Sequence, residues 1–481
     1  MYSRTTHIIN ISLLTGKFPS FCKYAQVIPI WKGGDTSEHN NYRPISILPV
    51  IGKCIEYFAS QQLTEYIETN QLFSNQQYGF RKNYSTTYLM IDLFDDIYNS
   101  KSKSKKPGII FLDIKKAFDT VDHKILLDKL YYYGIKDTAL EWIKSFLSDR
   151  VQCTKVNNKA TGFLSLTCGV PQGTVLGPIL FALYTQEVHK IIESYGLMFH
   201  MFADDMQIYT VYKGNESDLI PLNNCLNQVK LWANCNYLKL NDNKTKFLRV
   251  TSEKPRIKHL DCKLLDLEVT VFEKQVKNLG VIVDQKLSFK SQINKVCQLG
   301  YFMLKNLWRI SDKISSIELR IQIIHSCITS HIDYCNSLFV NLPQCDINKL
   351  LMLMNASVRF IYSLRRSKDI SITYYLKKCH FLPVKLRVNF KICVLVYKCQ
   401  HESAPEYLTE LLQEKDSLES LRVYKDRSLL KIENLNQLDY KNRRFSVIAP
   451  ILWNNLPRET RESESLFIFK KRLKTFYFDQ F

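Results

Sequence analysis

The segment from Leu197 to Tyr212 reads LMFHMFADDMQIYTVY, two apolar runs around a short polar tip. Apolar runs of this length on either side of a polar tip predict a β-hairpin, with its turn at Ala203, Asp204 and Asp205. Two adjacent aspartates in an apolar setting repel each other, and each loses hydration. Aspartate is also common in hairpin turns, so a purely structural role is the simpler interpretation of this segment alone.

A second apolar strand also ends at a carboxylate. GIIFLDI, residues 108–114, predicts a buried strand, and Asp113 stands near its end. Asp113, Asp204 and Asp205 together offer carboxylate oxygens, which Mg²⁺ prefers and Mn²⁺ also accepts. Two such ions promote in-line displacement at phosphorus, because one activates the attacking hydroxyl and the other holds the leaving group. The pattern is compatible with phosphoryl transfer that uses two divalent cations as cofactors, and a structural role of the aspartates stays open at this point.

The composition favours a polyanionic partner. The chain has 481 residues and a formal charge of 66 − 46 = +20, which is typical of nucleic-acid binding, although a basic enzyme without such a partner stays open. Residues 341–481 carry 25 basic and 15 acidic residues, so half of the excess lies there. Apolar residues at 46% and charged residues at 23% exclude a wholly disordered chain.

Fourteen cysteines occur singly, without a CxxC pair, which disfavours a zinc ribbon and a disulfide framework. The nearest cluster is Cys379, His380, Cys393, Cys399 and His401. Its spacing matches no familiar zinc pattern, so we expect core cysteines. Free thiols indicate a reducing, intracellular compartment. No apolar stretch approaches the roughly 20 residues that span a bilayer, so we expect no membrane partner.

Periodicity and turn residues predict the remaining elements. After an N-terminal helix that ends at Gly16 and a strand over 24–31, residues 32–44 are expected to form a loop. Further helices are expected over about 50–68, 85–99, 122–134, 137–147, 179–195 and 218–235, and further strands over 151–156, 163–170, 244–250 and 277–284. From about residue 289 the pattern is mostly helical, it weakens over 413–446, and residues 467–478 predict a basic amphipathic helix.

Seven stretches follow one another along the chain: NYRPISILPVIGKCIE (41–56), QYGFRKNYSTT (77–87), FLDIKKAFDTVDH (111–123), GVPQGTVLGPILF (169–181), FADD (202–205), NYLKLNDNKTKFL (236–248) and VKNLGVIVD (276–284). Asp204 follows Asp113 by 204 − 113 = 91 residues within this series. In their content and order these stretches resemble the motifs of the reverse transcriptases of non-LTR, LINE-type retrotransposons, in particular the Jockey-like group. The tail resembles the C-terminal region of these elements through HFLPVKLRVNFKI (380–392), SAPEYLTELL (403–412) and FSVIAPILWNNLP (445–457).

The resemblance implies an α+β fold of the right-hand polymerase type. Its palm would carry a mixed, largely antiparallel sheet between fingers and a helical thumb. We expect residues 1–40 to lead into the fingers, 41–284 to form fingers and palm, 285–345 to form a thumb-like helical region, and 346–481 to form a basic, mostly helical extension.

The resemblance also implies residue roles around the metal ions. Asp113, Asp204 and Asp205 would be metal ligands and catalytic residues, joined by the main-chain carbonyl of Ile114. Lys244 would protonate the leaving pyrophosphate, although a plain surface lysine is equally compatible with its position.

Further positions would bind the incoming nucleotide. Arg43 would contact the triphosphate, because a guanidinium matches phosphate oxygens in pairs. Phe118 would exclude a ribose 2′-hydroxyl, with core packing as the alternative. Gln172 and Gly173 would lie against the nucleotide and the template base. Asp119 is expected to cap the following helix.

Arg81 and Lys82 are further candidates for nucleotide binding. Both stand in the QYGFRKNYSTT stretch, and an ordinary solvated loop is an equally good interpretation of the two charges.

The implied function is that of an RNA-directed DNA polymerase, which adds dNTPs to a primer 3′-hydroxyl. The expected partners are an RNA template, a DNA primer, the element's own RNA and chromosomal target DNA, which implies action in the nucleus. The alternatives are a catalytically idle, transposon-derived nucleic-acid-binding protein and an RNA-dependent RNA polymerase. No stretch resembles the endonuclease of such elements, so a truncated copy or a fragmentary gene model is expected.

Overall fold

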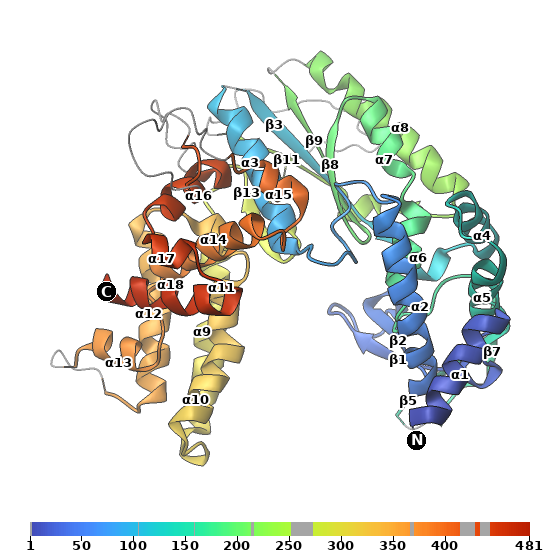
Figure 1. Cartoon of the computed structure of the whole chain (residues 1–481), viewed down its shortest axis with the longest axis horizontal. Helices are drawn as coiled ribbons and strands as arrows, with labels where there is room; N and C mark the ends of the chain where they lie inside the picture. The colour runs from blue at the N-terminus through green and yellow to red at the C-terminus, as the bar shows by residue number, and fades with distance from the viewer. Residues whose placement is uncertain are drawn as a thin grey trace.

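The computed structural model describes residues 2–103, 105–157, 159–212, 216–251, 273–365, 370–413, 429–432 and 443–481. Two lobes extend from a shared four-stranded sheet and diverge below it (Figure 1). The first lobe holds the N-terminal half of the chain and the second holds the C-terminal helices. The predicted α+β class and the helical C-terminal region are confirmed.

The shared sheet is antiparallel throughout, with strand order β11-β3-β9-β8. Its strands are β3 (Lys106–Leu112), β8 (Met198–Phe202), β9 (Asp205–Tyr212) and β11 (Lys246–Arg249). Side chains of β3 alternate between two hydrophobic cores: Ile109 and Phe111 belong to one, Ile110 and Leu112 to the other. Because successive side chains of a strand point to opposite faces, this sheet is the wall between the two cores. That position explains why GIIFL is apolar at every residue.

A second sheet lies in the first lobe, with order β2-β1-β5-β6 and with β7 also paired to β5. Its strands are β1 (Tyr24–Trp31), β2 (Tyr42–Ile47), β5 (Arg150–Val156), β6 (Lys159–Ala160) and β7 (Leu164–Leu166). Only β1 and β5 run parallel within it. The helices of this lobe are α1 (Tyr2–Thr15), α2 (Val50–Thr69), α4 (His123–Tyr132), α5 (Asp137–Leu147), α6 (Gly177–Thr185), α7 (Val188–Ser194) and α8 (Ile220–Cys235).

Two small antiparallel ladders complete the strands. They pair β4 (Ile114–Lys115) with β10 (Lys239–Leu240), and β12 (Gln275–Asn278) with β13 (Val281–Asp284). The strand predicted over 277–284 is therefore wrong, because Gly280 at φ 87° turns the chain into a hairpin. Part of the predicted loop over 32–44 joins β2, in which Pro44 is tolerated because β2 is an edge strand.

Two further predictions differ from the structure in extent. The strand predicted over 163–170 is shorter, since only Leu164–Leu166 pair with β5. The helix predicted over 179–195 divides into α6 and α7. The weakly patterned stretch over 413–446 lies largely outside the described residues.

The second lobe is helical. Its α-helices are α9 (Lys290–Arg309), α10 (Ile317–Ile324), α11 (Ser330–Asp333), α12 (Gln344–Ile361), α13 (Ile372–Lys378), α14 (Val384–Gln400), α15 (Glu406–Glu410), α16 (Phe445–Asn454), α17 (Arg458–Arg461) and α18 (Leu466–Asp479). Cys379, Cys393 and Cys399 are buried here, as expected of core cysteines. No helix in the described part of the chain is long and apolar enough to cross a membrane.

Helix α3 (Thr86–Ser102) joins the second lobe to the shared sheet. Its Asp95 is 3% exposed and accepts hydrogen bonds from the Ser446 amide at 2.8 Å and the Ser446 hydroxyl at 2.9 Å. The Arg444 guanidinium lies 3.3 Å from the same carboxylate. Burial raises the pKa of Asp95, and the bonds from Ser446 and the charge of Arg444 oppose that rise. The start of α16 is thus fixed to α3 by a buried, charged contact.

Replacing Asp95 with alanine should destabilise the fold by about 3–5 kcal/mol, because breaking a buried ion pair from one side leaves the other charge in a low dielectric. The measurement is urea unfolding followed by circular dichroism. Asp128→Ala, at an exposed position of α4, is the control and should stay within about 0.5 kcal/mol of the unmodified protein. A loss below about 1 kcal/mol for Asp95→Ala would show that this contact does not hold the lobes together.

Candidate active site

The hairpin predicted from LMFHMFADDMQIYTVY is confirmed. Strands β8 and β9 pair up to Phe202 and Asp205, so Ala203 and Asp204 form the turn between them. Ala203 has φ 60°, a left-handed conformation that is costly for a residue with a side chain. Such a conformation persists only where neighbouring structure imposes it.

Asp113 lies between β3 and β4, and Asn241 holds it from two sides. The Asn241 amide donates to the Asp113 carbonyl at 2.8 Å, and its side-chain Nδ2 donates to Asp113 Oδ2 at 2.8 Å. Sequence reasoning missed Asn241, although it stands three residues before Lys244 in the same motif. Strand β10 pairs with β4, which begins directly after Asp113. This pairing brings Asn241, the residue after β10, next to Asp113.

Electrostatic interactions among Asp113, Asp204 and Asp205 affect the pKa of the two hairpin aspartates. Burial raises the pKa of Asp205 to about 6, and repulsion from Asp204 and Asp113 adds to the rise. The pKa of Asp204 is also raised, mainly by burial and then by Asp113, while Lys244 and Arg43 oppose the rise. Mutual repulsion of this kind requires the three groups to share one neighbourhood. The register agrees with this, because Leu112 of β3 pairs with Met206 of β9, and Asp113 and Asp205 are the next residues at that end of the two strands. The roles of the three aspartates stay a prediction.

Lys244 forms an ion pair with one of the three carboxylates, that of Asp113. Its Nζ lies 3.1 Å from Asp113 Oδ2, and its side chain is 66% exposed. The described residues contain no group of three His, Cys, Asp or Glu side chains drawn together as a metal cluster. The donor set nevertheless fits Mg²⁺, because it consists of carboxylate oxygens that carry excess negative charge. Lys244 neutralises part of that charge from an exposed position.

Ile114 and Phe118 follow Asp113 on the same segment. Ile114 is buried in β4 opposite Leu240. The Phe118 ring is half-buried and packs against Phe181 of α6, with 4.8 Å between the ring centroids. Both the predicted role of Phe118 and simple core packing are compatible with a ring that is covered on one side.

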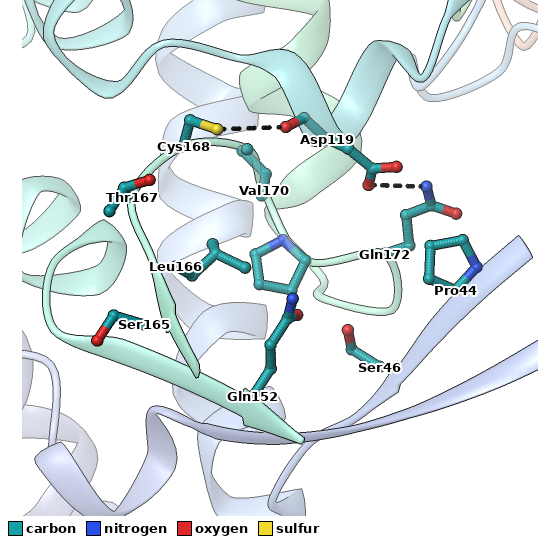
Figure 2. A pocket seen from close by; sticks show the side chains of 12 residues that line it. Pro44, Ser46, Asp119, Gln152, Ser165, Leu166, Thr167, Cys168, Val170 and Gln172 are labelled. Carbon is teal, nitrogen blue, oxygen red and sulfur yellow. Dashed lines mark hydrogen bonds between the residues drawn. The ribbon is translucent and has the colours of Figure 1, made fainter. Parts of the chain in front are cut away.

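Gln172 contacts Asp119, contrary to the predicted capping role of that aspartate. Gln172 Nε2 donates to Asp119 Oδ1 at 3.1 Å (Figure 2), while Asp122 caps α4 by accepting from the Ile125 amide at 2.9 Å. The prediction failed because two aspartates precede this helix and the later one stands next to its first turn. The Gln172 carbonyl accepts from the Ser46 amide at 2.7 Å, which ties this loop to β2.

Position 173 requires glycine because it lies against Ser46 of β2. Gly173 has φ 123°, and a Cβ there would stand 2.6 Å from the Ser46 carbonyl oxygen. The glycine thus permits close approach of β2. Glu56 of α2 fixes the other side of the loop, because its carboxylate accepts from the amides of Val175 and Leu176 at 2.6 and 3.3 Å.

A cavity of about 320 Å³ opens beside the contact between Gln172 and Asp119. It is lined by Pro44 and Ser46 of β2, Gln152 of β5 and the loop over 165–172 (Figure 2). None of the four candidate metal ligands lines it. The cavity is therefore separate from the three carboxylates.

The three candidate phosphate-binding cations have different surroundings. Arg43 is exposed on β2 and acts electrostatically on Asp204. The Arg81 side chain is 9% exposed, and its guanidinium forms a two-point ion pair with Glu68 of α2 at 2.7 and 2.9 Å. Lys82 is exposed in the following turn. Of these three cations, Arg43 is thus the one whose charge acts on the carboxylates, because it lowers the pKa of Asp204.

Solved structures of telomerase resemble this chain at low similarity. Apo telomerase from Candida tropicalis has a TM-score of 0.42 and 11% sequence identity, with 78% of this chain and 63% of that chain covered. Telomerase from Candida albicans in complex with a fragment of telomeric RNA has a TM-score of 0.39 and 13% identity, covering 84% and 67%.

Curated relatives are transposon proteins of the predicted group. A probable RNA-directed DNA polymerase from transposon BS of Drosophila melanogaster is 26% identical over 74% of this chain, and the RNA-directed DNA polymerase from the mobile element jockey of the same organism is 25% identical over 74%. The chain spans 40% and 39% of the length of these two relatives. The predicted resemblance to Jockey-like elements is confirmed.

A family model described as reverse transcriptase (RNA-dependent DNA polymerase) matches residues 30–283, more than half of the chain. The matched range includes Asp113, the hairpin turn and Lys244. The chain belongs to the reverse transcriptase family.

Proposed function

We propose that this chain is an RNA-directed DNA polymerase that adds deoxynucleotides to the 3′-hydroxyl of a primer. The observation that carries the proposal is the convergence of Asp113 with Asp204 and Asp205, from two strands, in a chain of the reverse transcriptase family. Burial and the neighbouring carboxylates raise the pKa of Asp204 and of Asp205, so keeping both ionised is costly unless a cation binds them.

Asp113, Asp204, Asp205 and the carbonyl of Ile114 would hold Mg²⁺, or Mn²⁺ in its place. Bound there, the two ions would supply charge stabilisation for the attacking and leaving oxygens of the displacement. Lys244 would protonate the leaving pyrophosphate, and its exposed side chain beside Asp113 leaves it free to reorient. Arg43 would bind the triphosphate through its guanidinium, with Arg81 and Lys82 as weaker candidates.

Phe118 and the Gln172–Gly173 loop would select the nucleotide. The half-buried Phe118 ring is held by Phe181, so it would resist displacement by a ribose 2′-hydroxyl. Gln172 would lie against the nucleotide and template base, and its bonds to Asp119 and Ser46 would keep it in position. Asp119 would then act through Gln172.

The proposal assigns parts of the chain to parts of a right-hand polymerase. Residues 1–40 would lead into the fingers, 41–284 would form fingers and palm, 285–345 the thumb, and 346–481 a basic extension. The partners would be an RNA template and a DNA primer, together with the element's own RNA and chromosomal target DNA, so the protein would act in the nucleus. The charge of +20 supports binding to phosphate backbones.

Asp204→Asn should abolish most incorporation of dTTP on poly(rA)·oligo(dT) with Mg²⁺. Losing a carboxylate that organises transition-state charge should lower the rate on the order of 10²–10³-fold. The measurement is extension of an end-labelled primer on a sequencing gel. Asp312→Asn, an exposed carboxylate in the second lobe, is the matched control and should keep the full rate.

The same experiment separates the rival functions. Extension that does not depend on Asp204 would contradict the proposed site. An unmodified protein that binds the primer–template without extending it would be the idle nucleic-acid-binding form, and efficient incorporation of UTP would indicate an RNA polymerase.

Phe118→Ala should admit ribonucleotides, because it removes the ring that would meet the 2′-hydroxyl. We expect the ratio of kcat/KM for dTTP to that for UTP to fall about 10- to 100-fold, while Phe118→Tyr, which keeps the ring, should preserve it. Steady-state single-nucleotide incorporation measures both ratios. An unchanged ratio in the alanine variant would assign Phe118 to core packing alone.

A further inference from the structure

The segment before Arg81 extends the shared sheet beside the aspartate hairpin. The Tyr78 amide donates to the Met201 carbonyl at 2.8 Å, and the Met201 amide donates to the Gln76 carbonyl at 2.9 Å. Gln77 is 1% exposed, and its Nε2 donates to the Gly79 carbonyl at 3.1 Å. Residues 76–79 therefore cover the open edge of β8 at Met201, two residues before the turn.

Gly79 touches the turn itself. A Cβ at Gly79 would stand 2.4 Å from the Ala203 amide nitrogen, so the two backbones are in direct contact. Ala203 holds its left-handed φ at this contact. Because a strained turn needs a rigid neighbour, the position of residues 76–79 determines where Asp204 and Asp205 lie.

The side chain of Tyr78 anchors residues 76–79 to α3. Its ring is 1% exposed, and its hydroxyl donates to the Asp92 carboxylate of α3. The same carboxylate oxygen lies 2.9 Å from His200 Nε2 of β8. The Tyr78 and His200 rings are 5.3 Å apart. One carboxylate thus binds both the segment that presses on the turn and the strand that leads into it.

The C-terminal region completes this arrangement through Tyr407 of α15. Its half-buried ring packs edge-on against Tyr78 with centroids 5.0 Å apart, and lies 5.8 Å from the ring of Tyr84. Tyr84 in turn lies under the Arg81 guanidinium, 4.2 Å from its centre. Aromatic pairs of this kind contribute about 0.5–1.5 kcal/mol beyond their buried area.

We propose that Tyr407 is a positioning residue, through which the C-terminal region braces the turn that carries Asp204 and Asp205. The path runs from Tyr407 to Tyr78, and from the backbone of residues 76–79 to Ala203. The catalytic part of this proposal rests on the proposed polymerase function, whereas the brace itself is a property of the fold. The region after residue 346 is then a component of the polymerase site as well as a basic surface.

The test compares Tyr407→Ala with Tyr375→Ala. Tyr375 of α13 is the matched control, because it is also half-buried and also packs on two rings, those of Tyr362 and Tyr374 at 4.9 and 5.2 Å. Small displacements at a reacting centre can cost about 10²-fold, so Tyr407→Ala should lower kcat for dTTP incorporation about 10- to 100-fold. KM for dTTP and the Kd for primer–template should stay within about twofold, and Tyr407→Phe should restore kcat.

A second measurement is independent of activity. Hydrogen exchange in the peptide containing residues 198–205 should become at least about tenfold faster in Tyr407→Ala and stay unchanged in Tyr407→Phe and Tyr375→Ala. If Tyr407→Ala is too unstable to purify, Tyr407→Leu, which keeps apolar bulk without the ring, replaces it in both measurements. Equal losses of kcat in the Tyr407 and Tyr375 variants, or unchanged exchange in residues 198–205, would overturn the proposal. Faster exchange in a protein without Asp204-dependent synthesis would retain the brace and reject the polymerase function.

Discussion

Three carboxylates on one helix hold this molecule together. On α3, Asp92 binds Tyr78 and His200, Asp95 binds Ser446, and Asp96 accepts a 2.5 Å hydrogen bond from Tyr209 of β9. Burial raises the pKa of Asp95 and Asp96, so their placement costs free energy that only satisfied partners offset. The partners come from both strands of the aspartate hairpin and from the C-terminal region. Helix α3 therefore links the hairpin to the C-terminal region.

Two close contacts between backbones also position the site. Gly79 presses on Ala203 at the turn, and Gly173 presses on Ser46 of β2. Each contact lets a loop lie against a strand at a distance that a side chain would forbid. The hairpin supplies Asp204 and Asp205, and the second contact orients the Gln172 loop. Both loops are positioned by backbone packing, which is more rigid than contacts between long side chains.

The elements that the sequence predicts well are those with strong local patterns. The hairpin around Ala203, the helix over 137–147 and the strand over 24–31 were predicted because their periodicity and turn residues agree. The resemblance to reverse transcriptases implied that Asp113 and Asp204 share one site. The contact of Asp119 with Gln172 and the grip of Asn241 on Asp113 join residues 53 and 128 positions apart, and local periodicity carries no information on such pairs.

The acidic residues of α3 stand in a sequence context similar to that of FADD. IDLFDDI, residues 91–97, places three aspartates among apolar residues, the same conflict that drew attention to FADD. Under the proposed function, the charges in FADD would be neutralised by a bound cation. In α3 the charges are already satisfied by tyrosine, histidine, serine and arginine. The sequence alone does not separate these two cases, because the partners lie up to 351 positions away. What distinguishes them is the count of hydrogen-bond donors around each carboxylate, and that count requires the fold.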